Sequence, residues 1–151
     1  MPIIKHEQFI LASREVCFDL ARNVEIHTKT TSKTKEEAVG GITQGLLRKG
    51  DTVTWEATHF GIRQKLTAKV IHMEKPTMFV DVMVKGAFNS FTHTHRFVEK
   101  NGGTIMIDIF EYKSPFGIVG IIVDKLFLER YMANFISSRT KELKRIAEDV
   151  E

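Results

Sequence analysis

Hydrophobic and polar positions change their period along this chain. Between residues 36 and 112, apolar residues largely alternate with polar ones, which is the period of a strand with one buried face. Before this region and after Ser114-Pro115, apolar residues recur instead at every third or fourth position, the spacing of one helix face. The pattern therefore predicts a series of strands between a short helical region and a long helix.

The N-terminal region predicts one strand and one or two short helices. PIIKHEQFIL, 2–11, is rich in β-branched and aromatic residues and predicts the first strand. Ser13 is suited to cap a helix because its side-chain oxygen can accept a hydrogen bond from the first turn. Apolar residues then follow at helical spacing up to Ala21, and we expect Asn23 to end this helix. The next stretch, 24–31, fits either a second short helix or a turn.

Six further strands follow, joined by short turns. They are predicted at 37–47, 52–60, 63–73, 78–86, 88–99 and 104–112. KNGG, 100–103, is a strong hairpin signal. Connections of this length join antiparallel neighbours, so the strands are expected to form one antiparallel sheet.

The C-terminal region predicts one long helix with an apolar stripe. The stripe consists of Leu128, Met132, Phe135, Arg139, Leu143, Ile146 and Val150. The expected helix has roughly thirty residues and a length of about 45 Å. A single sheet must bury its apolar face against this helix. We therefore predict an α+β protein, 1–151, with a curved antiparallel sheet of about seven strands wrapped round the long helix.

Strand parity predicts a polar cluster inside this arrangement. Each of the following residues shares a strand face with large apolar neighbours: Trp55, His59, Asp81, His93, His95 and Asp108. If these faces are all concave, polar groups from four strands converge in one apolar space. Buried charges are costly unless they are paired or hydrogen-bonded. Asp81 and Asp108 are therefore expected either to meet histidines and raise the pKa values of those rings, or to accept hydrogen bonds from hydroxyl or backbone donors.

The same parity gives a set of candidate ligand contacts. We predict that the wall of the space is formed by Trp55, His59, Asp81, Met83, Phe91, His93, His95, Phe97, Met106, Asp108, Phe110 and Tyr112 from the sheet, and by Leu128, Tyr131 and Phe135 from the helix. His27 lies in a segment that would cover the mouth of the space, where it could be a gate or a ligand contact; a surface position is the simpler interpretation. Cys17 is expected to be an inert core thiol.

Four interpretations of the histidine pair His93 and His95 compete. In the favoured one, His and Asp side chains fix the polar end of a ligand while aromatic residues hold its apolar body. A histidine held by Asp81 or Asp108 could instead act as an acid or base. His-x-His with His59 or an aspartate could hold a metal, although we expect none. Finally, the cluster could be a satisfied core network.

Several motifs in order resemble one known superfamily. They are Asp81, Gly86-x-Phe88, His93-x-His95 ending in Phe97, Thr104-x-Met106-x-Asp108, and then Tyr112, Pro115 and Gly117. Their order and spacing resemble the SRPBCC superfamily, the START-like helix-grip proteins, and within it the polyketide cyclase/dehydrase branch. The resemblance spans essentially the whole chain. It implies a cavity between the sheet and the long helix that binds a hydrophobic or amphipathic small molecule, without a cofactor. It does not fix an activity.

Composition and charge narrow the remaining classes. The net charge of +3 is small and its cations are dispersed, which does not indicate a nucleic-acid surface. The apolar run 115–128 is interrupted by Asp124 and Lys125 and is too short to span a bilayer. One cysteine and no signal-peptide pattern indicate a cytoplasmic protein. The long helix could support a homodimer, which nothing in the sequence requires.

These observations lead to one expected function and two alternatives. We expect a single-domain protein that binds a lipid-, polyketide- or aromatic-like molecule in the cavity. The first alternative is a small cyclase or dehydratase that uses His93 or His95 with Asp81 or Asp108. The second is an interaction module whose cavity is vestigial.

Overall fold

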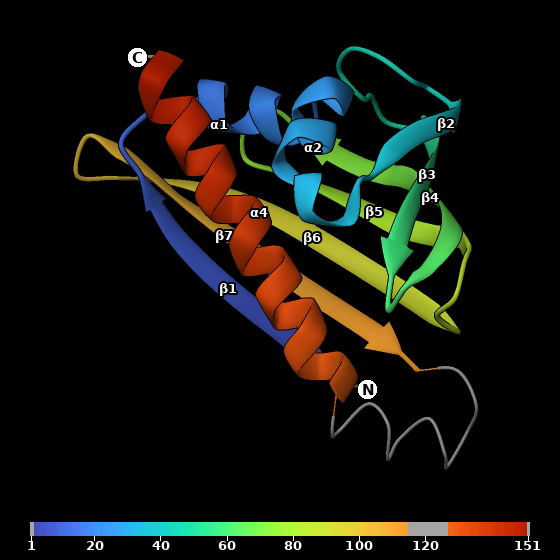
Figure 1. The fold of residues 1–151 in the computed structure, drawn as a ribbon. Coiled ribbons are helices and arrows are strands. Elements are labelled where there is room, and N and C mark those ends of the chain that lie inside the picture. Colours follow the sequence, from blue (N-terminus) through green and yellow to red (C-terminus); the bar gives the residue numbers. More distant parts are fainter. Residues whose placement is uncertain (1, 115–126, 151) are drawn as a thin grey trace.

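The computed structural model describes residues 2–114 and 127–150, and it contains one antiparallel sheet (Figure 1). The strands are β1 (Ile3–Ile10), β2 (Glu37–Gly41), β3 (Thr52–His59), β4 (Ile62–Glu74), β5 (Met78–Lys85), β6 (Ser90–Lys100) and β7 (Gly103–Lys113). Their order across the sheet is β1-β7-β6-β5-β4-β3-β2. Except for β1, each strand therefore lies beside its neighbour in sequence, as short hairpin connections require.

The helices lie against one face of this sheet. Helices α1 (Arg14–Ala21) and α2 (Val24–Thr30) and the short 3-10 helix η1 (Ser32–Thr34) lie near one end, and α4 (Glu129–Val150) crosses the sheet (Figure 1). The sheet curves round α4, which confirms the predicted α+β helix-grip arrangement. Helix α4 has 22 residues. The helix predicted from the sequence has roughly thirty residues and extends into 115–126. Most of the apolar run 115–128 also falls there. Residues 115–126 lie outside the described residues.

The caps of the two short helices explain where each begins. Ser13 accepts a hydrogen bond from the backbone N–H of Val16 and caps α1, as predicted. The expectation that Asn23 ends this helix is only half right. Asn23 follows α1, but its side chain accepts from the N–H of Ile26 and starts α2. The ambiguous stretch 24–31 is therefore mainly helical.

Strand β2 is shorter than predicted because the backbone turns away at Gly41. Gly41 has φ of +66°, and a Cβ atom there would lie 2.3 Å from the carbonyl oxygen of Thr52. Only glycine tolerates that approach. Residues 42–47, predicted as strand, therefore leave the sheet edge, and Leu46 pairs with Asn23 as an isolated bridge instead.

Two hairpins use two-residue turns with positive φ at both positions. Asn101 and Gly102 join β6 to β7, as the KNGG signal predicts, and Phe60 and Gly61 join β3 to β4. These angles fit a type I′ turn, whose twist matches that of the flanking strands. Phenylalanine is unusual in this region of backbone space. Phe60 is also 63% exposed, and its ring centroid lies 4.4 Å from that of Tyr131 on α4.

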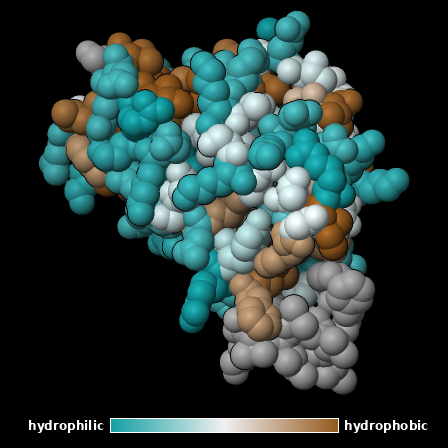
Figure 2. All heavy atoms as spheres, in the orientation of Figure 1, coloured by the Kyte–Doolittle hydropathy of each residue, from teal (hydrophilic) through white to brown (hydrophobic). Residues whose placement is uncertain are grey.

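Large apolar side chains fill both ends of the space between helices and sheet. Phe18 of α1 contacts Phe79 and Phe97 edge-on, with centroids 5.5 and 5.3 Å apart. Cys17 is fully buried beside them, as predicted. The face that carries α4 is largely hydrophilic, with apolar side chains in separate places (Figure 2). The amphipathic pattern of the sequence thus directs the apolar side of α4 toward the sheet.

Candidate functional site

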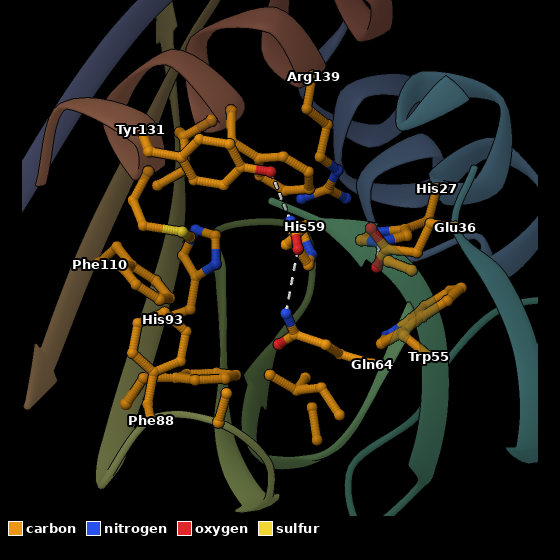
Figure 3. Close-up of a pocket in the computed structure, with 18 of the residues that line it drawn as sticks. His27, Glu36, Trp55, His59, Gln64, Phe88, His93, Phe110, Tyr131 and Arg139 are labelled. Atoms are coloured by element: carbon orange, nitrogen blue, oxygen red, sulfur yellow. Dashed lines mark hydrogen bonds and ion pairs between the residues drawn. The ribbon is translucent and has the colours of Figure 1, made fainter. Parts of the chain in front are cut away.

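A cavity of about 320 Å³ lies between the sheet and α4 (Figure 3). It is lined by side chains of β3, β4, β5, β6, β7 and α4, together with residues that precede β2 and β6. Of the predicted contacts, those in its wall are Trp55, His59, Asp81, Phe91, His93, Asp108, Phe110, Leu128, Tyr131 and Phe135.

Five predicted contacts lie elsewhere. Met83, Phe97, Met106 and Tyr112 pack into the core clusters behind the wall and are absent from the cavity lining. These residues share strand faces with lining residues. Because the sheet curves, however, residues at the ends of such a face contact the helices rather than the cavity. His95 faces a smaller neighbouring hollow of about 70 Å³.

One side of the cavity is aromatic. The ring centroid of Phe110 lies 5.1 Å from that of Phe91 and 5.8 Å from that of Phe88. Leu128, just before α4, and Met132 of α4 pack against this group. Such clustered rings offer a flat apolar surface to a bound molecule. Phe88, which precedes β6, belongs to the motif that suggested the fold, although it was not among the predicted contacts.

The other side of the cavity begins at a crossed pair of hydrogen bonds between neighbouring strands. Asp81 of β5 lies opposite His93 of β6, and His95 lies opposite Asp108 of β7. The hydrogen bonds follow the diagonals. Nε2 of His93 lies 2.9 Å from Asp108 Oδ1, and Nε2 of His95 lies 2.9 Å from Asp81 Oδ1. Parity therefore predicted the right four residues.

His95 lies between two carboxylates. Its Nδ1 is 3.2 Å from Oδ1 of Asp108, so both ring nitrogens face an acidic oxygen. Burial disfavours the charged ring, but the bonds to Asp108 and Asp81 outweigh it and raise the pKa of His95 above 6.5. Burial also opposes ionisation of Asp108 and Asp81, yet the two histidines lower the pKa of each carboxyl. We therefore describe a histidine cation held by two carboxylates.

His93 behaves differently, although its ring stacks on His95 with centroids 3.9 Å apart. Burial and the neighbouring His95 cation lower the pKa of His93 despite its bond to Asp108. The prediction that carboxylates raise the pKa of both rings is thus wrong for His93. A neutral His93 that donates from Nε2 to Asp108 carries a lone pair on Nδ1. In the described part of the chain, that nitrogen has no hydrogen-bond partner, and the ring lines the cavity.

Thr140 of α4 connects the helix to this network. Its hydroxyl Oγ1 lies 3.2 Å from Oδ2 of Asp108 and 2.9 Å from the carbonyl oxygen of Ile136. Asp108 thereby receives donors from the sheet and from the helix. This contact fixes the height of α4 over the polar end of the cavity.

Sequence reasoning missed a second polar pair. Nε2 of His27, on α2, lies 2.8 Å from Oε1 of Glu36, and the His27 ring stacks on Trp55 with centroids 4.0 Å apart. His27 is therefore buried against the cavity, and the surface interpretation is wrong. Burial and the charge of Arg139 lower its pKa. A weak signal existed, since His27 lies three residues after the buried Val24 and shares its helix face.

Arg139 is a further lining residue that sequence reasoning left out. It occupies the apolar stripe of α4, and its side chain descends toward His27 and Glu36 (Figure 3). A cation within an apolar stripe was the available signal. Burial raises the pKa of Glu36, but the opposing effects of His27 and Arg139 are larger, so its pKa lies below the ordinary value.

His59 and Tyr131 close the cavity near the β3–β4 hairpin. Nδ1 of His59 lies 2.6 Å from the hydroxyl oxygen of Tyr131. The amide of Gln64 donates to the backbone carbonyl of His59 at 3.2 Å. Burial lowers the pKa of His59 and raises that of Tyr131. Both groups are thus uncharged near neutral pH and offer hydrogen bonds without charge.

Solved structures share this architecture at low sequence identity. The protein TTHA0849 from Thermus thermophilus aligns with a TM-score of 0.82 and 18% identity over 99% of each chain. Ginseng major latex-like protein 151 from Panax ginseng aligns at 0.68 and 11% over 97% of each. The di-domain ARO/CYC StfQ of the steffimycin biosynthetic pathway aligns at 0.76 and 9%, over 97% of this chain and 50% of that one. The chain has the helix-grip fold that these structures share. No family model and no curated protein matches its sequence.

Within this helix-grip fold, one set of three side chains has the spacing of metal ligands. Ligand atoms of Asp81, His93 and His95 all lie within 4.8 Å of one another. The same atoms are engaged in the hydrogen bonds described above, so a metal ion would have to displace the proton that His95 shares with Asp81.

In the described part of the chain, no helix is long and apolar enough to cross a membrane.

Proposed function

We propose that this protein binds a hydrophobic or amphipathic small molecule in the cavity between the sheet and α4. The observation that carries the proposal is the division of the wall into an aromatic side and a polar side. A volume of about 320 Å³ falls within the range of small-molecule sites. The aromatic side, with Phe88, Phe91 and Phe110, would remove the apolar body of the ligand from water.

His93 is proposed to orient the ligand. Its Nδ1 lone pair would accept a hydrogen bond from a ligand hydroxyl, while Asp108 holds the ring from the other side. The neighbouring His95 would not contact the ligand in the main cavity, because both of its nitrogens face carboxylates. A sequence with one cysteine, which is buried, suits a reducing compartment, and we retain the cytoplasm as the proposed location.

Native mass spectrometry of the protein purified from its own host tests this function. We expect a co-purified apolar molecule of defined mass. Ala57→Phe places a ring in the cavity wall and should abolish that mass. Val84→Phe adds a ring at an exposed position of β5 and should leave it unchanged. If both variants retain the molecule equally, it is bound elsewhere and the proposal is wrong.

A second candidate function is acid/base catalysis, as in a cyclase or dehydratase. The observation that favours it is the neutral His93 held by an ionised Asp108 beside the cavity. Such a ring can take a proton from a substrate and return it, while the carboxylate stabilises the transient cation. The similarity to an ARO/CYC protein supports the same class. A ligand returned unchanged after incubation with wild-type protein, but bound more weakly by His93→Phe, would favour binding over catalysis.

A further inference from the structure

Arg139 is a buried cation that forms no ion pair with a carboxylate of the described residues. It is 8% exposed, and one terminal nitrogen, Nη2, donates to the carbonyl oxygen of Ala21 at 3.1 Å. Its Nε is buried and has no hydrogen-bond partner among the described residues. The carboxylates lining the cavity are bonded to histidines instead: Glu36 to His27, Asp81 to His95, and Asp108 to His93 and His95.

The guanidinium of Arg139 has more N–H donors than hydrogen-bond acceptors around it. Arginine carries five N–H donors and remains charged in proteins, and a buried charge is costly unless its donors are satisfied. Arg139 lines both the main cavity and the smaller hollow beside it. The missing acceptor therefore has to come from what the cavity contains.

The charges of the wall indicate what kind of acceptor fits. Three carboxylates, the buried Glu36 and Asp108 and the half-buried Asp81, line the cavity. Two buried basic residues face them: Arg139, which lines both cavities, and His95, which lines the smaller one. The other lining histidines, His27, His59 and His93, are neutral because burial lowers their pKa values. Lys65 is exposed at the rim, where solvent screens it. Carboxylates thus outnumber the buried cations around the two cavities, and an anionic ligand would be repelled.

We propose that Arg139 binds the carbonyl oxygen of an uncharged ligand, and that the cavity selects such ketones over carboxylates. The inference deepens the proposed function and rests on it. A neutral carbonyl supplies lone pairs to the guanidinium without adding charge. Nδ1 of His93 also lines the cavity, but it accepts rather than donates, so it cannot serve the same oxygen. The ligand class is therefore a neutral aromatic or alicyclic ketone, in which a hydroxyl group near His93 would add a second contact.

Three naphthalene probes that share one ring system test this selection. They are 6-propionyl-2-(dimethylamino)naphthalene, a neutral ketone; 6-(dimethylamino)-2-naphthoate, an anion; and 2-(dimethylamino)naphthalene, which lacks the oxygen. Fluorescence titration of the wild-type protein should give the tightest binding for the ketone. A hydrogen bond to a charged donor makes it about tenfold tighter than the oxygen-free probe. The carboxylate should bind most weakly.

Arg139→Gln is the variant that isolates the contact. We expect the preference for the ketone over the oxygen-free probe to fall to about twofold, since a neutral donor is weaker. The emission of the bound ketone should shift to shorter wavelength, because its carbonyl then accepts a weaker hydrogen bond. Arg145→Gln, on the exposed side of the same helix, should change neither quantity.

The outcomes distinguish a failure of this inference from a failure of the proposed function on which it rests. If no probe binds, the proposed function is contradicted, and the inference with it. If all three bind but the carboxylate is tightest, or the ketone has no advantage, the selection by Arg139 is wrong while the binding function stands. Because this ranking is measured on the wild-type protein, it decides the matter even if Arg139→Gln does not fold.

Discussion

His95 and His27 are both buried histidines bonded to carboxylates, yet their pKa values move in opposite directions. His95 lies in the middle of the sheet between Asp81 and Asp108, and its pKa is raised. His27 lies on the short helix α2 with Glu36 as its one carboxylate partner, near the cation Arg139, and its pKa is lowered. Burial pushes both rings toward the neutral form, so a second carboxylate decides which one is charged.

The comparison also separates two kinds of polar wall. Around His95, each charged side chain pairs with one of opposite charge, and this hydrogen-bond network connects three strands and α4. The polar side chains around His27 face the cavity, and Nε of Arg139 has no hydrogen-bond acceptor among the described residues. The first region is expected to govern stability and the second to govern binding.

The largest effect is expected from Asp108→Asn. The substitution leaves His95 with one carboxylate instead of two and weakens the hold on His93. Breaking a buried ion pair on one side costs about 3 kcal/mol, and we expect this loss in the free energy of unfolding measured with urea near pH 7. Asp149→Asn, at a side chain that is 78% exposed, should change it by less than about 0.5 kcal/mol. A loss below about 1 kcal/mol for Asp108→Asn would contradict the closed network.

A smaller effect is expected in the pH dependence of stability. Because the folded pKa of His95 is raised above 6.5, its contribution is complete below pH 6.5 and is lost as pH rises through the folded value. Between pH 6.5 and 9, wild-type unfolding free energy should fall by on the order of 1 kcal/mol more than that of His95→Gln.

His27→Gln provides the opposite control. Its folded pKa is lowered, so its contribution is present above pH 6.5 and declines as pH falls toward the folded value. This variant should keep the wild-type slope above pH 6.5 and flatten the slope below it. Equal slopes for both variants throughout would show that the two histidines do not differ as described.

The smallest effect is expected from Glu36→Gln. The amide retains a hydrogen bond to the neutral His27, so the unfolding free energy should fall by only about 1 kcal/mol. The loss of the carboxylate charge, which acts to raise the pKa of His27, should lower that pKa further in an NMR titration. Glu37→Gln, at the exposed neighbouring position, should leave the His27 titration unchanged. An upward shift in Glu36→Gln would contradict the contact between the Glu36 carboxylate and His27.

Most of the sheet could be predicted because strand parity has a fixed period. The faces of β5, β6 and β7 followed directly from alternation, which grouped Asp81, His93, His95 and Asp108 from the sequence alone. Residues 42–47 were assigned to the sheet in error because alternation continues past Gly41, where a close backbone approach ends the pairing.

Parity could not show how deep a residue lies along a curved sheet. Phe97 and Met106 share faces with lining residues but reach the core under α1. The pairing of His27 with Glu36 could not be found, because this contact joins α2 to the residue before β2 and no local period relates the two residues. Arg139 was visible as an anomaly in the stripe of α4, but its environment depends on three other elements.

The hydroxyl of Thr140 has one proton and two acceptors, Asp108 Oδ2 and the carbonyl oxygen of Ile136. If a bound ligand moved α4 away from the sheet, this proton would stay with the helix and Asp108 would lose a donor. Asp108 would then hold a proton on His93 more strongly. Ligand occupancy and proton uptake would in that case be linked, and by reciprocity the affinity for a molecule that does not itself titrate would vary with pH.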